Sequence, residues 1–184
     1  MRRLLDRLYG GALMLAALAL VAIAILVFIQ VSGRLIDRGA LALGFARPGI
    51  SVPSLAEIGG FLFVGAATLA LAGTFRRGGH VRVTMLVQMA RGRLHRALVL
   101  LALAGAAALA AFAAWNSVLQ AHDSWAFNST SFGMVRVPLW IPQGVMALGF
   151  VIFLVALVDD LIVALRGDPS FRRAELERES GHGH

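Results

Sequence analysis

The chain has 184 residues, of which 59% are hydrophobic, and a formal net charge of +7. Four long apolar runs and their short connections use nearly all of this length, which leaves no room for a separate soluble domain. The basic residues lie at the ends of the apolar runs, where membrane topology places them, so the positive charge does not indicate nucleic-acid binding. The absence of cysteine excludes disulfides, thiolate metal sites and cysteine nucleophiles.

Each apolar run has the length of a transmembrane helix. About 20 residues cross a hydrocarbon layer of about 30 Å at about 1.5 Å per residue. The first run follows arginines, as a secretion signal does, but it is too long for a signal core and ends without a convincing cleavage site, so we expect it to be retained. The sequence predicts an all-α integral membrane protein with four transmembrane helices in a single domain over residues 1–168. The predicted spans are Leu8–Val31, Leu55–Phe75, Ala97–Leu119 and Pro138–Val158.

The arginines give the four spans a direction. The N-terminal segment, the second loop and the tail together carry 13 arginines, whereas the first and third loops carry four. The positive-inside rule therefore predicts that both termini and the 76–96 loop are cytoplasmic. Trp115, Trp125 and Trp140 then lie near the outer interface, as expected of an aromatic belt. Residues 169–184 are expected to form a charged, disordered cytoplasmic tail.

The segment 32–49 after the first span allows two interpretations. Its apolar residues are mixed with Arg34, Asp37 and Arg38. It could be a helical extension that lies along the membrane interface. It could equally be an ordinary outer loop that ends at Pro48 and Gly49.

Two acidic features mark the ends of the second and fourth spans. Ser54 is a candidate N-cap, and Glu57 completes a capping box that also suits the positive end of the helix. We therefore interpret Glu57 as a cap at the outer boundary rather than as a buried acid. Asp159 and Asp160 close the fourth span, where they oppose the helix dipole, so we expect them to pair with arginines of the cytoplasmic side or of a partner.

The centres of the spans lack the residues that membrane chemistry requires. They contain no Asp, Glu, Arg or His, and Thr68 is the only polar residue near a centre. Ion pathways usually need ionisable groups at this depth. All five histidines lie in loops or in the tail, which disfavours haem binding inside the bundle, and no nucleophile is matched with a base. The sequence thus predicts an accessory subunit that is not an enzyme and has no catalytic, cofactor or metal site.

A motif in the second loop makes this prediction more specific. The stretch after span two reads GTFRRGGHVRVTML over residues 73–86. It resembles the small membrane subunit (DctQ type) of tripartite ATP-independent periplasmic (TRAP) transporters, in which "G-x-H-[IV]-R-[VL]-D" follows span two. The residues from Pro138 to Gly144 are similar to the "P-x-W … P-x-G" start of the family's fourth span. Thr84 departs from the family, which commonly has Asp there.

The resemblance implies a complex in the inner membrane of a bacterium. A large multi-span subunit would carry the substrate and sodium, and a periplasmic binding protein would deliver an organic anion, often a carboxylate. This chain would be a scaffold for the large subunit. The alternative is a free-standing four-span scaffold or assembly factor with no transport role. Candidate residues for docking on the partner or on lipid phosphates are His80, Arg82, Arg76, Arg77, Glu57, Asp159 and Asp160; for the loop residues the alternative is topology charge alone.

Overall fold

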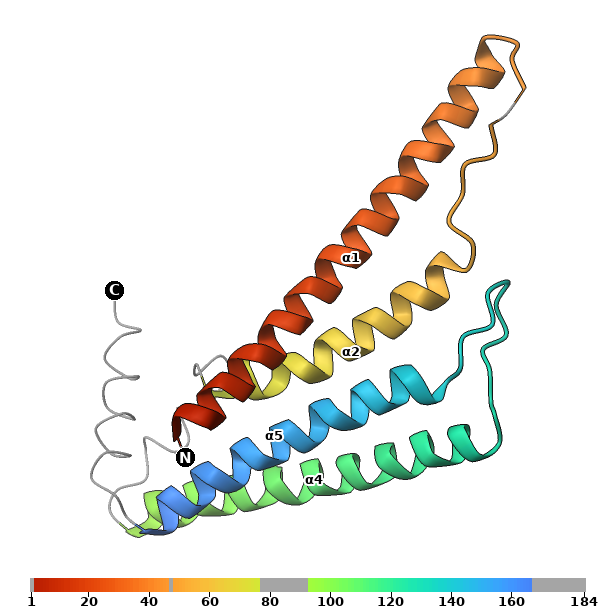
Figure 1. The fold of residues 1–184 in the computed structure, drawn as a ribbon. Helices are drawn as coiled ribbons and strands as arrows, with labels where there is room; N and C mark the ends of the chain where they lie inside the picture. Colours follow the sequence, from red (N-terminus) through yellow and green to blue (C-terminus); the bar gives the residue numbers. More distant parts are fainter. Residues whose placement is uncertain (1, 47, 77–92, 167–184) are drawn as a thin grey trace, which may run out of the picture.

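A computed structural model describes residues 2–46, 48–76 and 93–166, and over these ranges the protein is a single layer of four long helices (Figure 1). The helices are α1 (Arg2–Ala42), α2 (Leu55–Arg76), α4 (Arg93–Ala126) and α5 (Trp140–Arg166). All four are long and apolar enough to cross a membrane. The predicted all-α membrane fold with four spans is therefore confirmed.

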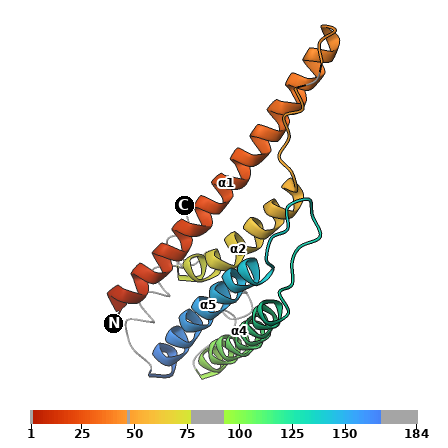
Figure 2. The ribbon, with the colours of Figure 1, turned by 45° about the vertical axis from the view of Figure 1, so that its right-hand side comes forward.

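The order of the helices in space differs from their order in the chain. Across the layer they run α1, α2, α5, α4, and the main contacts join α1 to α2, α2 to α5, and α5 to α4 (Figures 1 and 2). The two central helices, α2 and α5, run in the same direction. We call the end of the helices that carries the connections 43–54 and 127–139 the loop end, and the opposite end the termini end.

Two helices end at the loop end with the same hydrogen-bonded turn. In α1, Phe45 N–H donates to the carbonyl of Ala40, and Gly44 takes a φ of 80°. In α4, Ser129 N–H donates to the carbonyl of Ser124, and Asn128 takes a φ of 49°. This is the Schellman arrangement, which satisfies the last carbonyls of a helix and favours Gly or Asn in the left-handed position.

The segment 32–49 is helical in its first part and a loop in its second, and the interfacial position of the helical part stays a prediction. Residues 32–42 continue α1 in line with the span, and residues 43–54 form a loop that returns to α2 (Figure 1). The fourth helix begins at Trp140, two residues after the predicted start, because Pro138 pairs with Thr130 in an antiparallel β-bridge. Residues 167–184, where the predicted tail lies, are outside the described residues.

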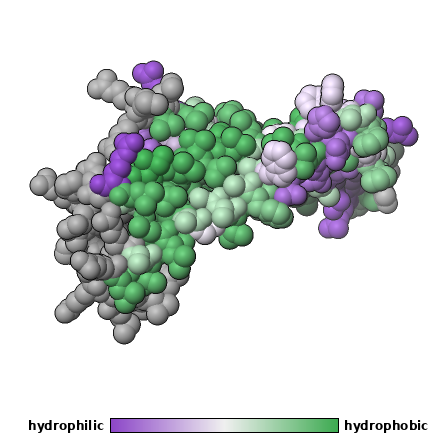
Figure 3. All heavy atoms as spheres, turned by 90° about the horizontal axis from the view of Figure 1, so that it is seen from below, coloured by the Kyte–Doolittle hydropathy of each residue, from purple (hydrophilic) through white to green (hydrophobic). Residues whose placement is uncertain are grey.

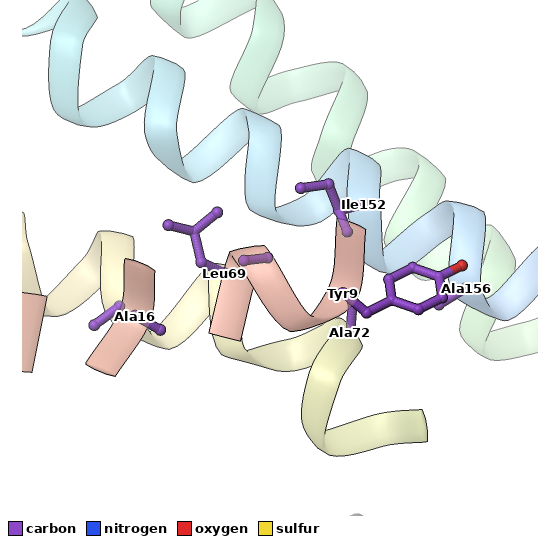
Figure 4. Close-up of a cluster of buried hydrophobic side chains, with 8 residues drawn as sticks. Tyr9, Ala16, Leu69, Ala72, Ile152 and Ala156 are labelled. Atoms are coloured by element: carbon purple, nitrogen blue, oxygen red, sulfur yellow. The ribbon is translucent and has the colours of Figure 1, made fainter. Parts of the chain in front are cut away.

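The core is built mainly from alanine. One cluster joins three helices, with Tyr9 and Ala16 on α1, Leu69 and Ala72 on α2, and Ile152 on α5 (Figure 4). A second cluster joins α4 to α5; its buried members are Leu103, Ala107, Ala110, Leu157 and Ala164. Because lipid tails are as apolar as leucine, helices in a membrane associate through close packing of small residues rather than through the hydrophobic effect.

The two central helices approach each other closely at Gly149. A Cβ atom at this position would lie 2.6 Å from the backbone carbonyl carbon of Thr68 and 2.7 Å from its Oγ1. One turn earlier, a Cβ atom on Gly65 would lie 3.1 Å from Cγ1 of Val145. Toward the termini end, the rings of Phe75 and Phe153 meet edge to face with centroids 5.8 Å apart. Glycine is therefore required at 149 by space rather than by backbone conformation.

The surface of the layer is that of a protein surrounded by lipid. Large apolar side chains are exposed along both edge helices. On the face that Figure 3 shows, the middle is hydrophobic and the hydrophilic residues lie toward the two ends, most of them at the loop end. Phe28 is 72% exposed on α1, and Leu109 and Phe112 are 72% and 70% exposed on α4. Such a surface is stable only against lipid tails or against another membrane protein.

Gly149→Ala is expected to destabilise the protein by about 1–3 kcal/mol, because the added methyl group overlaps Thr68 in a contact that cannot open without moving two helices. The measurement is the unfolding midpoint of the purified chain in detergent. Gly144→Ala is the matched control on the same helix, because a Cβ atom there meets nothing within 4 Å. Equal midpoints for the two variants would contradict the proposed role of the α2–α5 contact.

Candidate functional site

The connection between α4 and α5 is an ordered hairpin at the loop end. Ser131 N–H donates to the carbonyl of Val137 at 2.9 Å, and Leu139 N–H donates to the carbonyl of Ser129 at 3.0 Å. The Ser131 hydroxyl completes the turn by accepting from Val137 N–H at 3.1 Å and donating to the carbonyl of Val135 at 3.2 Å. These bonds fix the tip of the hairpin, residues 132–136, as a unit.

The tip of the hairpin is attached to the start of α2. Val135 N–H donates to Oγ of Ser54 at 3.0 Å. Gly133 faces the same place, since a Cβ atom there would overlap Oε2 of Glu57 and lie 2.6 Å from Oγ of Ser54. We call this contact of Ser54 and Glu57 with Gly133 and Val135 the α2–hairpin joint. It connects the third loop to a helix about 80 residues earlier in the chain.

Glu57 is half-buried in this joint, and the hydrogen bonds around it are not those of the capping box that the sequence predicted. Its amide donates to the backbone carbonyl of Ser54, and the Ser54 hydroxyl accepts from Val135 rather than capping α2. Ser54 has a φ of 55°, which is not the extended conformation of an N-cap. Oε2 of Glu57 is buried and has no hydrogen-bond partner among the described residues.

A second buried polar atom lies at the start of α5. Oε1 of Gln143 is inaccessible to solvent and has no hydrogen-bond partner in the described part of the chain. Sequence reasoning placed Gln143 only in a family-like "P-x-G" stretch and gave it no role. Buried polar atoms are normally paired, because each unmade hydrogen bond costs about 1–3 kcal/mol. Gln143 and Glu57 are thus the two positions at the loop end whose polar groups are not satisfied within residues 2–46, 48–76 and 93–166.

The acidic pair of α5 lies at the termini end, in the last two turns of the helix. Asp160 is buried, with 8% of its surface exposed, and Asp159 is half-buried. Neither carboxylate is free, since each takes part in an interaction within the protein. The pairing of these acids with particular arginines stays a prediction.

The basic turn that carries the family motif begins where α2 ends. Arg76 is the last residue of α2. Arg77, His80 and Arg82 lie outside the described residues, as does the side chain of Arg76. Their predicted docking role is therefore untested by the structure. What the fold adds is the position of Arg76, at the same end of the layer as the acidic pair of α5 (Figure 1).

The polar residue at mid-span serves its own helix. The Thr68 hydroxyl donates to the carbonyl of Val64 at 2.9 Å and approaches the carbonyl of Gly65 at 3.2 Å. Thr68 is 7% exposed and packs against Gly149. Within the described ranges no group of three or more His, Cys, Asp or Glu side chains could hold a metal ion. The described helices thus offer packing surfaces and joints rather than reactive groups.

A layer of four membrane-length helices, joined by small residues and tied together at the loop end, is the architecture of a multi-span membrane subunit. Residues 23–167 match the family described as tripartite ATP-independent periplasmic transporters, DctQ component. The match covers most of the chain, so the protein belongs to the DctQ family. No curated protein matches the chain.

Membership of this family supports several of the expectations from sequence. The protein is the small membrane component of a TRAP transporter and a multi-pass protein of the bacterial inner membrane. The family works in a complex with a large membrane subunit and a periplasmic binding protein. The family consists of transporter components rather than of known enzymes.

Gly133→Ala is expected to destabilise the protein by about 1 kcal/mol, because the new methyl group displaces only the ends of the Glu57 and Ser54 side chains from the joint. Glu57→Ala alone should cost less, since it removes a buried carboxylate oxygen that lacks a partner. In the double variant the two losses should not add, and the coupling should reach at least about 0.5 kcal/mol, as for residues in contact. Unfolding midpoints of the four proteins measure the cycle; strictly additive losses would contradict the joint.

Proposed function

We propose that the protein scaffolds the large transport subunit of a TRAP system for sodium-coupled uptake of an organic anion, a carboxylate, which a periplasmic binding protein delivers. The observation that carries this proposal is the family match over residues 23–167. The nature of the described spans supports it. Thr68 bonds to its own helix, and the rest of the span centres is apolar, as suits a subunit that braces its partner and does not conduct.

Partner docking involves the two ends of the layer in different ways. At the termini end, the basic turn that starts at Arg76 supplies positive charges for the large subunit or for lipid phosphates, and the neighbouring acids Asp159 and Asp160 contribute to the surface that meets the large subunit. Within the membrane, the exposed apolar faces of α1 and α4 supply the area for a helical partner. At the loop end, Glu57 is enclosed in the joint, so we propose that it acts on any partner through the hairpin.

The proposed orientation places both termini in the cytoplasm. The fold supports this because the start of α1 and the end of α5 both lie at the termini end (Figure 1). The loop end, with its four arginines, then faces the periplasm, and the arginine-rich end faces the cytoplasm.

A single cysteine reports this orientation without background, because the chain has no cysteine of its own. Met134→Cys, at an 88% exposed position on the hairpin, should react in intact cells whose outer membrane is permeable to a charged maleimide. Arg166→Cys, at the exposed end of α5, should react only after the inner membrane is opened. The reverse pattern would exclude cytoplasmic termini.

The chain should co-purify with a much larger membrane subunit in mild detergent when both are expressed together. Combined His80→Ala and Arg82→Ala should reduce the recovered large subunit, or the uptake of the carboxylate in cells, by roughly 10-fold if each residue makes a charge-assisted contact. Arg93→Ala with Arg96→Ala is a control that removes two positive charges from the start of α4. Full association and uptake at normal abundance in both double variants would favour a role in topology alone.

Migration of the chain only as a monomer or homodimer, with no large subunit bound under co-expression, would favour the alternative of a free-standing four-span scaffold. Uptake in a deletion strain, restored by the intact chain and not by an empty vector, distinguishes a transport role from an assembly role. The transported acid is identified in the same strain by testing candidate carboxylates one at a time.

A further inference from the structure

The outer part of α1 projects beyond the rest of the layer. Past the start of α2, α1 continues to Ala42, and the loop 43–54 runs back along the same helix (Figures 1 and 2). We call residues 30–42 of α1 the arm and residues 49–52 of the loop the strap.

Three positions on the arm hold the backbone of the strap. Oε1 of Gln30 accepts from Val52 N–H at 2.6 Å, and Oδ1 of Asp37 accepts from Gly49 N–H at 3.0 Å. Between them, Gly33 lies against the strap so closely that a Cβ atom would overlap the carbonyl oxygen of Ile50 and lie 3.1 Å from its carbonyl carbon. Because Gln30 and Asp37 bond to backbone amides, these contacts depend on the backbone path of the strap and not on which side chains the strap carries.

The spacing of these contacts matches the geometry of the two segments. Positions 30, 33 and 37 follow the i, i+3, i+7 pattern of a single helix face. Seven helical residues from Gln30 to Asp37 rise about 10.5 Å, at 1.5 Å per residue. Three extended residues from Gly49 to Val52 span about 10 Å. Three residues can therefore reach from one bond to the other, and both bonds form at once although Gly49 itself has a φ of 72°.

The arm needs such support because its sequence is a weak helix former. Gly33 and Gly39 both disfavour helix, and an isolated helix of this length is marginal in water. Most side chains of the arm are exposed, including Leu35 at 63% and Ile36 at 50%, whereas Gly33 is buried under the strap. Glycine at 33 thus lowers the helix propensity of the arm but permits the contact that holds it.

We propose that residues 49–52 are a backbone strap that locks residues 30–42 of α1 into a rigid arm, so that the arm moves as one body with the four-helix layer. The contact between the strap and the arm is made by Gln30, Gly33 and Asp37. It does not depend on which substrate is transported or on whether the chain transports at all.

Hydrogen exchange of the full chain in lipid nanodiscs tests the strap, with mass spectrometry of peptides that cover residues 48–54. Gly33→Ala should speed exchange across the strap by about 10-fold, because the methyl group displaces Ile50 and opens both flanking bonds. Gly39→Ala is the matched control on the same helix, since a Cβ atom there meets nothing within 4 Å. Unchanged exchange in Gly33→Ala, or equal acceleration in both variants, would overturn the proposal.

Two substitutions of Asp37 separate backbone recognition from folding defects. Asp37→Asn keeps the Oδ1 acceptor and should leave exchange of the strap unchanged. Asp37→Leu keeps the approximate shape and removes the acceptor, so it should speed exchange at Gly49 by several-fold. Similar exchange in both variants would show that the bond to Gly49 does not hold the strap.

The rigidity of the arm has its own measurement. Spin labels on Leu41→Cys and Phe127→Cys, two exposed positions in a chain without other cysteines, should give a narrow distance distribution. Adding Gly33→Ala should broaden it, and adding Gly39→Ala should not. A distribution that stays narrow without the strap would show that α1 is rigid by itself and would overturn the role proposed for residues 49–52.

Discussion

The close approach of α2 and α5 at Thr68 and Gly149 is the contact on which the layer depends. α2 and α5 are the central helices, and each edge helix packs mainly on one of them. In lipid, apolar side chains gain nothing by leaving the bilayer for another apolar surface, so the helices are held by packing at short range. Gly149 allows this short distance between α2 and α5, because a larger residue in its place would place a Cβ atom against the backbone of Thr68.

The loop end meets a different constraint, which is the pairing of backbone polar groups close to the membrane. Unpaired amides and carbonyls cost several kcal/mol in hydrocarbon, or about 1–3 kcal/mol each when buried in protein. The hairpin satisfies its own amides through Ser131 and gives one more to Ser54. The strap gives two amides to Gln30 and Asp37. These same bonds connect α1, α2 and the α4–α5 connection at one end of the layer.

These features suit a component that keeps its shape within a larger complex. The mid-span hydroxyl of Thr68 is used by its own helix, and the described surface is apolar along both edges of the layer. At the loop end, the hydrogen bonds of the joint and of the strap connect segments that are far apart in the chain. These bonds hold the connected segments in a fixed arrangement.

The four spans, the absence of ionisable groups at their centres and the DctQ resemblance can be predicted from the amino-acid sequence, since these follow from local hydropathy and from short motifs. The roles of Glu57, Gln30, Asp37 and three glycines depend on the packing of the helices. Ser54 and Glu57 have the spacing of a capping box, but Val135 takes the serine hydroxyl and Gly133 faces the carboxylate. Gly33, Gly133 and Gly149 look like any other glycine in this chain, because the backbone or side chain that each one faces is 17 to 81 residues away. A local pattern cannot encode a contact whose partner is fixed only when the helices have packed.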